Sequence, residues 1–84
     1  MDKQYFCYIV RCADDSLYTG ISTDVDRRVK QHNAGRGAKY TSQRLPVELI
    51  YTEPAGNRAE ALVRERAIKK LPRSKKFSLA SSKS

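Results

Sequence analysis

A chain of 84 residues has room for one hydrophobic core, so the sequence predicts a single domain over residues 1–79 with a frayed tail over 80–84. No apolar run approaches membrane-spanning length and the first residues are mostly polar, which predicts a cytoplasmic protein that makes no membrane contact. The 17 Lys and Arg residues outnumber the 9 Asp and Glu residues, and this net charge of +8 favours a nucleic-acid partner over a charge that serves solubility alone.

The first two elements are predicted to form a β-hairpin. Residues 5–12 crowd aromatic and β-branched side chains with apolar residues at both parities, which is typical of a central strand. A turn signal follows at 13–16, and a second strand at 17–21. If Cys7 and Cys12 share the first strand they lie about 17 Å apart, too far for a disulfide. We expect reduced core thiols, and the absence of a Cys-x-x-Cys pair argues against zinc.

A helix is predicted from Ser22 or Thr23, either of which is a candidate N-cap, to about Asn33. Gly35 follows its end, where a left-handed residue is common. Residues 34–45 are expected to be a basic loop. Pro46 opens a third strand over 47–51, and a section with Pro54 and Gly56 ends it.

Asn57 and Glu60 form a predicted capping box for a helix over 58–71, which Pro72 ends. A short helix over 74–79 is expected after it. The order β-β-α-β-α, with this further C-terminal helix, predicts an α+β fold with a three-stranded, mainly antiparallel sheet flanked by helices.

Several polar side chains are candidates for chemistry. Glu65 shares a helical row with Ala61 and Ile68, so its carboxylate is either a ligand or paired with Lys69 one turn later. Arg28 and His32 are one turn apart and can reach one site, and the plain alternative is a solvated helix face on which Asp24 pairs with Arg28. Tyr8 and Tyr18 fall on paired strands, where sheet packing is the plain alternative. Taken singly, each of these residues fits a structural role.

Taken together, their order resembles the GIY-YIG nuclease superfamily. The strand motifs stand as Phe6-Cys7-Tyr8 and Tyr18-Thr19-Gly20, followed by Arg28 and His32 on one helix and by Glu65 on a later one. The resemblance covers residues 4–77 and is greatest to small stand-alone bacterial members, whose next run is similar to Gly37-Ala38-Lys39-Tyr40-Thr41. The first motif keeps only its tyrosine, and the downstream asparagine of many members is missing, since none follows Asn57.

The resemblance implies a divalent-metal-dependent endonuclease that hydrolyses phosphodiester bonds in DNA, with branched or damaged DNA in repair or recombination as the expected substrate. Glu65 would hold one Mg²⁺ or Mn²⁺ ion, Arg28 would clamp the phosphate, and Tyr18 would hydrogen-bond the phosphate or the water. Either Tyr8 or His32 would take the proton from water. His titrates closer to neutral pH, whereas family mechanisms often assign the strand-one tyrosine, so both assignments stay open.

Basic residues on both sides of these candidates predict a groove that follows a phosphate backbone, with DNA favoured over RNA. Its residues are Arg36, Lys39, Arg44, Lys69 and Lys70, and Tyr40 is available to stack on an exposed base. We expect a monomer without a protein partner. The alternative is a catalytically weak or inactive nucleic-acid-binding module, associated with RNA or the ribosome, which the missing asparagine and the small size favour.

Overall fold

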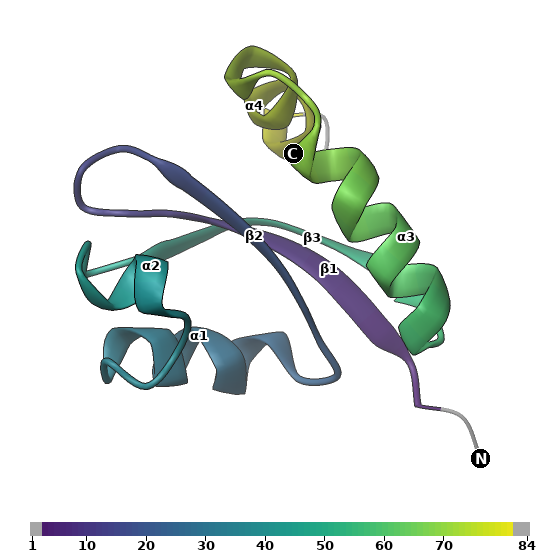
Figure 1. The fold of residues 1–84 in the computed structure, drawn as a ribbon, viewed down its shortest axis with the longest axis horizontal. Coiled ribbons are helices and arrows are strands. Elements are labelled where there is room, and N and C mark those ends of the chain that lie inside the picture. The colour runs from purple at the N-terminus through teal and green to yellow at the C-terminus, as the bar shows by residue number, and fades with distance from the viewer. Residues whose placement is uncertain (1–2, 82–84) are drawn as a thin grey trace.

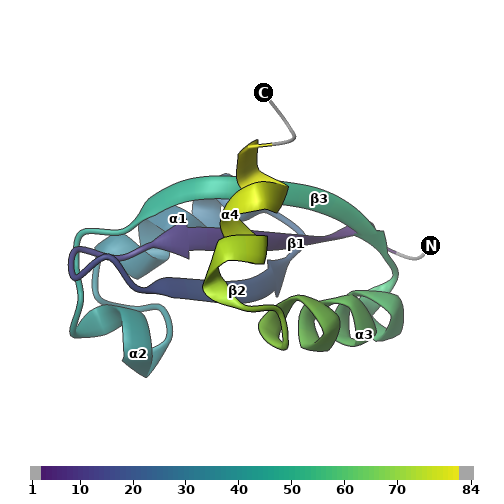
Figure 2. The same cartoon turned by 90° about the horizontal axis from the view of Figure 1, so that it is seen from above.

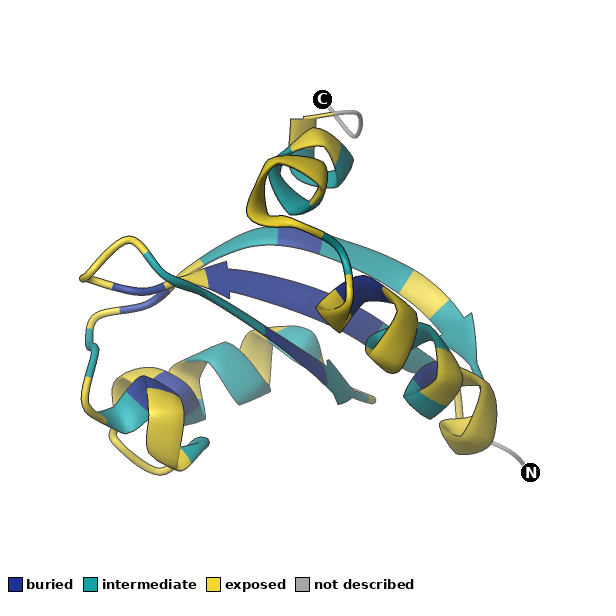
Figure 3. Cartoon of the chain, turned by 45° about the horizontal axis from the view of Figure 1, so that its top comes forward, coloured by how far each residue is buried: buried dark blue, intermediate teal, exposed yellow. Residues whose placement is uncertain are grey.

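The first strand lies at the centre of the sheet. In the computed structural model, which describes residues 3–81, β1 (Tyr5–Arg11) pairs antiparallel with β2 (Leu17–Ser22) on one side and with β3 (Glu48–Gly56) on the other. Its residues at positions 7–10 are all buried, at both parities (Figure 3). Apolar residues on both parities are needed because both faces of this strand are covered. The predicted central strand and three-stranded antiparallel sheet are thus confirmed.

Helices cover the two faces of the sheet in pairs. Figure 1 shows α1 (Val25–Asn33) and α2 (Lys39–Ser42) close together on one side, and α3 (Arg58–Lys69) and α4 (Arg73–Ser81) on the other. Figure 2 shows α4 crossing the sheet next to β3. Two buried clusters result. Tyr8 and Val10 pack toward Val25 and Val29 of α1 on one face, and residues 7, 9, 51 and 68 form the core of the other.

The two cysteines point into different clusters. Cys7 belongs to the cluster beneath α3, and Cys12 belongs to the cluster on the α1 face. Both are free and buried. The prediction of reduced core thiols is therefore confirmed, and its reason is stronger than distance alone, because the sheet separates the two side chains.

Helix α1 begins one or two residues later than the sequence predicts. Asp24 is the N-cap, and its carboxylate accepts a hydrogen bond from the Arg27 amide at 3.1 Å. Ser22 supports this cap instead of providing it, because its hydroxyl accepts from the Asp24 amide at 3.0 Å. The end of the helix is as predicted, with Gly35 at a φ of 79° just beyond it. That conformation suits glycine, which has no Cβ to clash.

Further boundaries differ from the prediction, among them the end of α3 at Lys69, two residues before the expected 71. The expected loop over 34–45 contains the four-residue helix α2. Strand β3 continues to Gly56 and passes through Pro54, which an edge strand tolerates because one of its sides needs no amide donor. Helix α4 extends two residues beyond the expected 79, while residues 82–84 of the expected frayed tail lie outside the described part.

The predicted capping box of α3 is present. The Asn57 side chain accepts from the Glu60 amide at 2.9 Å, and the Glu60 carboxylate accepts from the Asn57 amide at 3.0 Å. This fixes the start of the helix that carries Glu65. No helix within residues 3–81 combines the length and the apolar character needed to cross a membrane.

Candidate active site

The Tyr8 side chain crosses the sheet above Gly20. The two residues are register partners on β1 and β2, and a Cβ added to Gly20 would lie 2.6 Å from the Tyr8 hydroxyl oxygen. Only glycine leaves room for the phenol ring at this position. The Tyr8 hydroxyl therefore lies over β2, which is an edge strand of the sheet. Helix α3 packs against β2 on the opposite face of the sheet. Residues from both faces can meet at this edge.

His32 joins Tyr8 in a buried hydrogen-bonded chain. The Tyr8 hydroxyl lies 2.8 Å from Nε2 of His32, and Nδ1 of His32 lies 2.7 Å from the Thr41 hydroxyl. Tyr8 exposes 1% of its surface, and His32 and Thr41 expose none. Because the three groups are removed from bulk water, they satisfy one another's hydrogen-bonding groups.

Burial sets the protonation of this pair. It raises the pKa of Tyr8 above its ordinary value; a hydrogen bond from Arg28 opposes the rise, while Tyr18 and Glu65 add to it. Burial also lowers the pKa of His32, and the positive charge of Arg28 lowers it further. At neutral pH the resting pair is therefore a neutral phenol beside a neutral imidazole.

Arg28 approaches the pair from α1. It is half-buried, and its Nη1 donates to Oε1 of Gln31 at 3.1 Å, which holds the guanidinium on the helix face that carries His32. Its charge acts on both Tyr8 and His32. The structure thus brings Tyr8, Arg28 and His32 together, as the sequence predicts for residues of one site.

Tyr18 and Tyr40 form a wall beside His32. The Tyr18 ring lies edge-on to His32 with centroids 5.5 Å apart, and it stacks on Tyr40 at 6.2 Å. The outer face of Tyr40 carries the Arg44 guanidinium, 3.8 Å from the ring centroid. Arg44 is held by Oδ2 of Asp14 at 3.0 Å and by the Tyr40 carbonyl at 2.8 Å. Within the described chain the Tyr18 hydroxyl makes no hydrogen bond.

Glu65 reaches the site from α3. Its carboxylate raises the pKa of Tyr8, which places it within electrostatic range of that hydroxyl. It exposes 16% of its side chain and pairs with Lys69 at 3.6 Å. Of the two alternatives weighed for Glu65, the ion pair with Lys69 one turn later is present, and its role as a metal ligand stays a prediction.

A single carboxylate fits a metal ion that takes its other ligands from outside the protein. Among residues 3–81 no group of three or more His, Cys, Asp or Glu side chains could enclose an ion. Mg²⁺ commonly binds through one or two carboxylates and completes its shell with water and substrate phosphate. Glu65, partly exposed and close to Tyr8, suits that mode of binding.

The predicted basic groove residues are dispersed. Arg36 is exposed between α1 and α2, Lys39 is exposed at the start of α2, and Lys70 is exposed at the end of α3. Lys69 is paired with Glu65, and Arg44 is enclosed by Asp14 and Tyr40. Tyr40 exposes 40% of its surface, but Tyr18 and Arg44 lie against its ring. A nucleic-acid base would have to displace Arg44 to stack there.

Sequence reasoning missed two residues that position the site. No sequence pattern singles out Thr41, because its contact with His32 spans nine residues and belongs to no helical period. Gly37 lies against the imidazole, where an added Cβ would overlap Nδ1 of His32. The sequence feature that could have indicated both residues is the segment Gly37–Thr41, which resembles the small bacterial members of the GIY-YIG superfamily.

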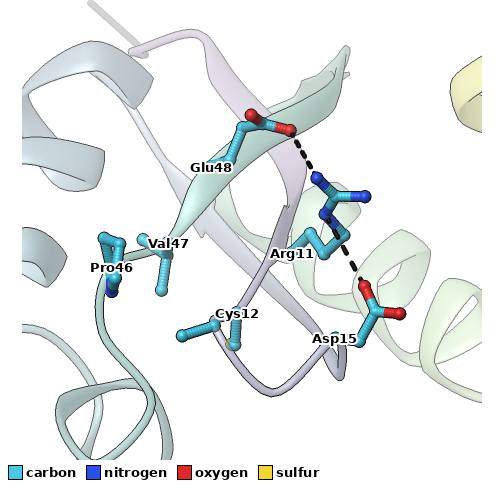
Figure 4. A pocket seen from close by; sticks show the side chains of 7 residues that line it. Arg11, Cys12, Asp15, Pro46, Val47 and Glu48 are labelled. Atoms are coloured by element: carbon cyan, nitrogen blue, oxygen red, sulfur yellow. Dashed lines mark hydrogen bonds and ion pairs between the residues drawn. The ribbon is translucent and has the colours of Figure 1, made fainter.

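A separate surface pocket lies where β1 ends and β3 begins. It has a volume of about 540 Å³ and is lined by residues 11–13, 15 and 46–48 (Figure 4). Its charges are paired with one another, since Arg11 contacts Glu48 at 3.4 Å and Asp15 at 3.8 Å. None of the residues predicted for catalysis lines this pocket, so we assign the site to the β2 edge instead.

Comparisons with known proteins identify the family of the chain. Residues 4–78 match the family described as the GIY-YIG catalytic domain. The chain is 54% identical over 80 residues to a UPF0213 protein of Haloquadratum walsbyi, covering 95% of this chain and 90% of the relative. It is 52% identical over 81 residues to a UPF0213 protein of Staphylococcus saprophyticus, covering 96% and 98%.

Two solution NMR structures share the fold. A UPF0213 protein from Bacillus halodurans is 46% identical with a TM-score of 0.59, covering 95% of this chain and 85% of that one. A protein from E. faecalis is 41% identical with a TM-score of 0.63, covering 98% and 90%. From the family match and these relatives we conclude that the chain belongs to the GIY-YIG nuclease superfamily and is similar to its small UPF0213 proteins.

Proposed function

We propose that the protein is a divalent-metal-dependent endonuclease that hydrolyses phosphodiester bonds in DNA. The observation that carries the proposal is the buried Tyr8 hydroxyl 2.8 Å from Nε2 of His32, with Arg28 and Glu65 both acting on that hydroxyl. Hydrolysis needs a proton acceptor for water and positive charge near the phosphorus. These four side chains, drawn from β1, α1 and α3, supply both requirements.

The proton acceptor is the Tyr8–His32 pair acting together. Tyr8 alone is a weak base at neutral pH, because burial raises its pKa and keeps the phenol protonated. His32 is neutral, with a lowered pKa, and can accept a proton at Nε2. As water attacks phosphorus, its proton passes to the Tyr8 oxygen while the Tyr8 proton passes to His32. No phenolate needs to exist before substrate binds.

The phosphate is held by groups that border this pair. Arg28 presents a planar guanidinium that can donate two parallel hydrogen bonds to phosphate oxygens and stabilise the charge that develops there. The Tyr18 hydroxyl has no partner within residues 3–81, so it can donate to a phosphate oxygen or orient the water. A metal ion at Glu65 would supply Lewis-acid stabilisation of the same charge.

We infer branched or damaged DNA as the substrate, with a role in repair or recombination, since a domain of this size reads backbone shape more easily than sequence. The surplus of basic residues supports a nucleic-acid partner. We further propose a cytoplasmic monomer that acts without a protein partner.

A panel of labelled substrates tests the proposal. Flaps, forks, nicked duplexes and single strands of DNA, with RNA counterparts, are incubated with the protein in Mg²⁺ or Mn²⁺ and in EDTA. We expect cleavage of at least one DNA substrate that requires the divalent ion. Uncut DNA throughout the panel, or cleavage that persists in EDTA, would overturn the assignment.

Two matched variants test the proton acceptor. Tyr8→Phe and Tyr18→Phe each remove one hydroxyl and leave the ring in place. We expect Tyr8→Phe to lose the greater part of kcat, because it breaks the link between water and His32. If only Tyr18→Phe loses activity, the base is Tyr18, and the Tyr8–His32 pair is structural.

The second candidate function is nucleic-acid binding without cleavage. The Glu65–Lys69 ion pair favours it, because a carboxylate held by an ammonium at 3.6 Å is partly neutralised as a metal ligand. In that case the protein binds the DNA or RNA of the panel equally well with and without divalent ions, and no product appears. Lys69→Met would then release Glu65 and produce metal-dependent cleavage where the wild type shows none.

A further inference from the structure

His32 lies between two hydroxyl groups, and each of its ring nitrogens faces one of them. Nε2 faces Tyr8 at 2.8 Å, and Nδ1 faces Thr41 at 2.7 Å. A neutral imidazole carries one N–H donor and one acceptor nitrogen, so the two hydroxyls must play opposite roles. Which nitrogen carries the proton decides whether His32 can accept from Tyr8 at all.

The Thr41 proton is directed away from His32. The Thr41 hydroxyl donates to the Ala38 carbonyl at 2.9 Å. A hydroxyl has one proton, so its oxygen is left to accept from Nδ1. Donation from Nδ1–H to Thr41 leaves Nε2 without a proton and facing Tyr8.

The surroundings of Tyr8 require the same assignment. Tyr8 exposes 1% of its surface, its hydroxyl is hydrogen-bonded to Nε2 of His32, and the cationic group that acts on it is Arg28. A guanidinium cannot accept a hydrogen bond, so Nε2 of His32 is the acceptor available to the Tyr8 proton. The opposite tautomer would leave a buried hydroxyl proton unsatisfied, which is costly.

The backbone around Thr41 is built closely against the imidazole. At Gly37 no side chain larger than hydrogen fits beside Nδ1 of His32. One turn later, α2 is anchored from outside by Arg44, which donates to the Tyr40 carbonyl at 2.8 Å and is bound by Asp14. These contacts hold the Thr41 hydroxyl at a fixed position.

We propose that Thr41 is a positioning residue that holds His32 in the tautomer protonated on Nδ1, so that Nε2 is ready to accept the Tyr8 proton. Its catalytic consequence rests on the proposed function, whereas the tautomer itself does not. When His32 takes the proton at Nε2, the imidazolium still donates through Nδ1 to Thr41. Thr41 therefore also stabilises the charged form that the proton transfer produces.

NMR of the imidazole tests the tautomer directly. The chain contains one histidine, so the ¹⁵N signals of His32 need no assignment against others. Near neutral pH we expect Nδ1 to be the protonated nitrogen in the wild type and in Thr41→Ser. In Thr41→Val, which keeps the shape but removes the acceptor, the Nε2-protonated form should appear. A wild type protonated on Nε2, or a Thr41→Val spectrum unchanged from wild type, would overturn the proposal.

Activity provides the second readout. Thr41→Val should lower kcat roughly 10- to 100-fold, the usual effect of losing such a supporting contact, with KM little changed and Thr41→Ser restoring the rate. Ser42→Ala is the matched control, because within residues 3–81 the only side-chain hydrogen bond of the Ser42 hydroxyl is to the Lys39 carbonyl in the same helix. A Ser42→Ala loss equal to that of Thr41→Val would show a general effect of α2 and overturn the positioning role. If the wild type does not cleave DNA, the proposed function fails, and the tautomer is still decided by NMR.

Discussion

The central residue of the site, His32, is buried without charge, and this has consequences for stability. Burial lowers its pKa below the ordinary 6.5, and Arg28 lowers it further. An unfolded chain leaves the imidazole in water, where it is protonated below about pH 6.5. Between that pH and the lowered folded pKa, the unfolded state binds more protons than the folded state.

We therefore predict that the free energy of unfolding falls as pH drops below about 6.5, before the carboxylates titrate. The contribution of His32 is fully present above that pH and is lost progressively below it. Urea titrations across this range, for the wild type and for His32→Gln, measure the difference. Because glutamine does not titrate, the variant should show a flatter dependence, and parallel curves would contradict a buried neutral His32.

A substitution of Arg28 provides a second test, in this case of how the site binds phosphate. Replacing it with lysine keeps the charge but loses the planar pair of donors that matches a phosphate. We predict that Arg28→Lys lowers kcat/KM at least about tenfold, roughly 1.4 kcal/mol of transition-state stabilisation. Initial rates on one cleaved substrate measure the change. Equal rates would mean that Arg28 acts only through its charge.

The residues predicted for catalysis could be proposed from the sequence because their order resembles a known family, and the structure brings Tyr8, Tyr18, Arg28 and His32 into one cluster. Thr41 could not be predicted. Its role depends on the path of the chain after Gly35, which no local pattern encodes.

For the helices and strands, residues close to each end explain which boundaries could be predicted from the sequence. The capping box formed by Asn57 and Glu60 lies within four residues, so the start of α3 could be predicted from the sequence. Helix α2 could not, because its N-cap Ala38 makes no side-chain hydrogen bond and its stability depends on contacts such as Thr41 with His32. The length of β3 could not be predicted, because Pro54 usually marks the end of a strand and is tolerated here at the edge of the sheet.

Asn33 joins two elements that support the site. At the end of α1 its side chain accepts from the Val47 amide at 2.7 Å and donates to the Val47 carbonyl at 3.0 Å. We predict that Asn33→Ala lowers the free energy of unfolding by about 1–2 kcal/mol, from two lost hydrogen bonds of ordinary strength. Asn33→Asp, which keeps the acceptor but loses the donor, should also destabilise. Denaturant unfolding that gives both variants the wild-type stability would show that the link is not needed.

At the scale of the whole molecule, many charges are already paired. Acidic residues hold Arg11, Arg44, Arg64, Lys69 and Arg73 in ion pairs of 2.8–3.6 Å. The net charge of +8 is a property of the whole chain and does not show that these paired side chains are free to bind phosphate. Composition could predict a polyanionic partner, but it could not predict which basic residues remain available.

Lys39 and Arg44 allow a basic residue that is available to phosphate to be compared with one that is held in an ion pair. Lys39 is exposed and forms no ion pair within residues 3–81, whereas Arg44 is bound by Asp14 and covers Tyr40. We predict that Lys39→Ala reduces the salt dependence of single-strand binding by about 0.7 in log–log slope for one lost phosphate contact. Arg44→Ala should change the slope less. Titrations of labelled DNA at several salt concentrations measure both, and a larger change for Arg44→Ala would show that it leaves Asp14 to bind the backbone.

Replacing Glu65, the proposed metal ligand, tests metal-dependent cleavage directly. Glu65→Gln keeps the size of the side chain and removes the charge that would hold the ion. The measurement is the initial rate of DNA cleavage in Mn²⁺ by the wild type and by this variant, with DNA binding of both measured in parallel. We predict cleavage by the wild type, none detectable by the variant, and nearly equal DNA binding by the two proteins. A variant that cuts at the wild-type rate would contradict this prediction.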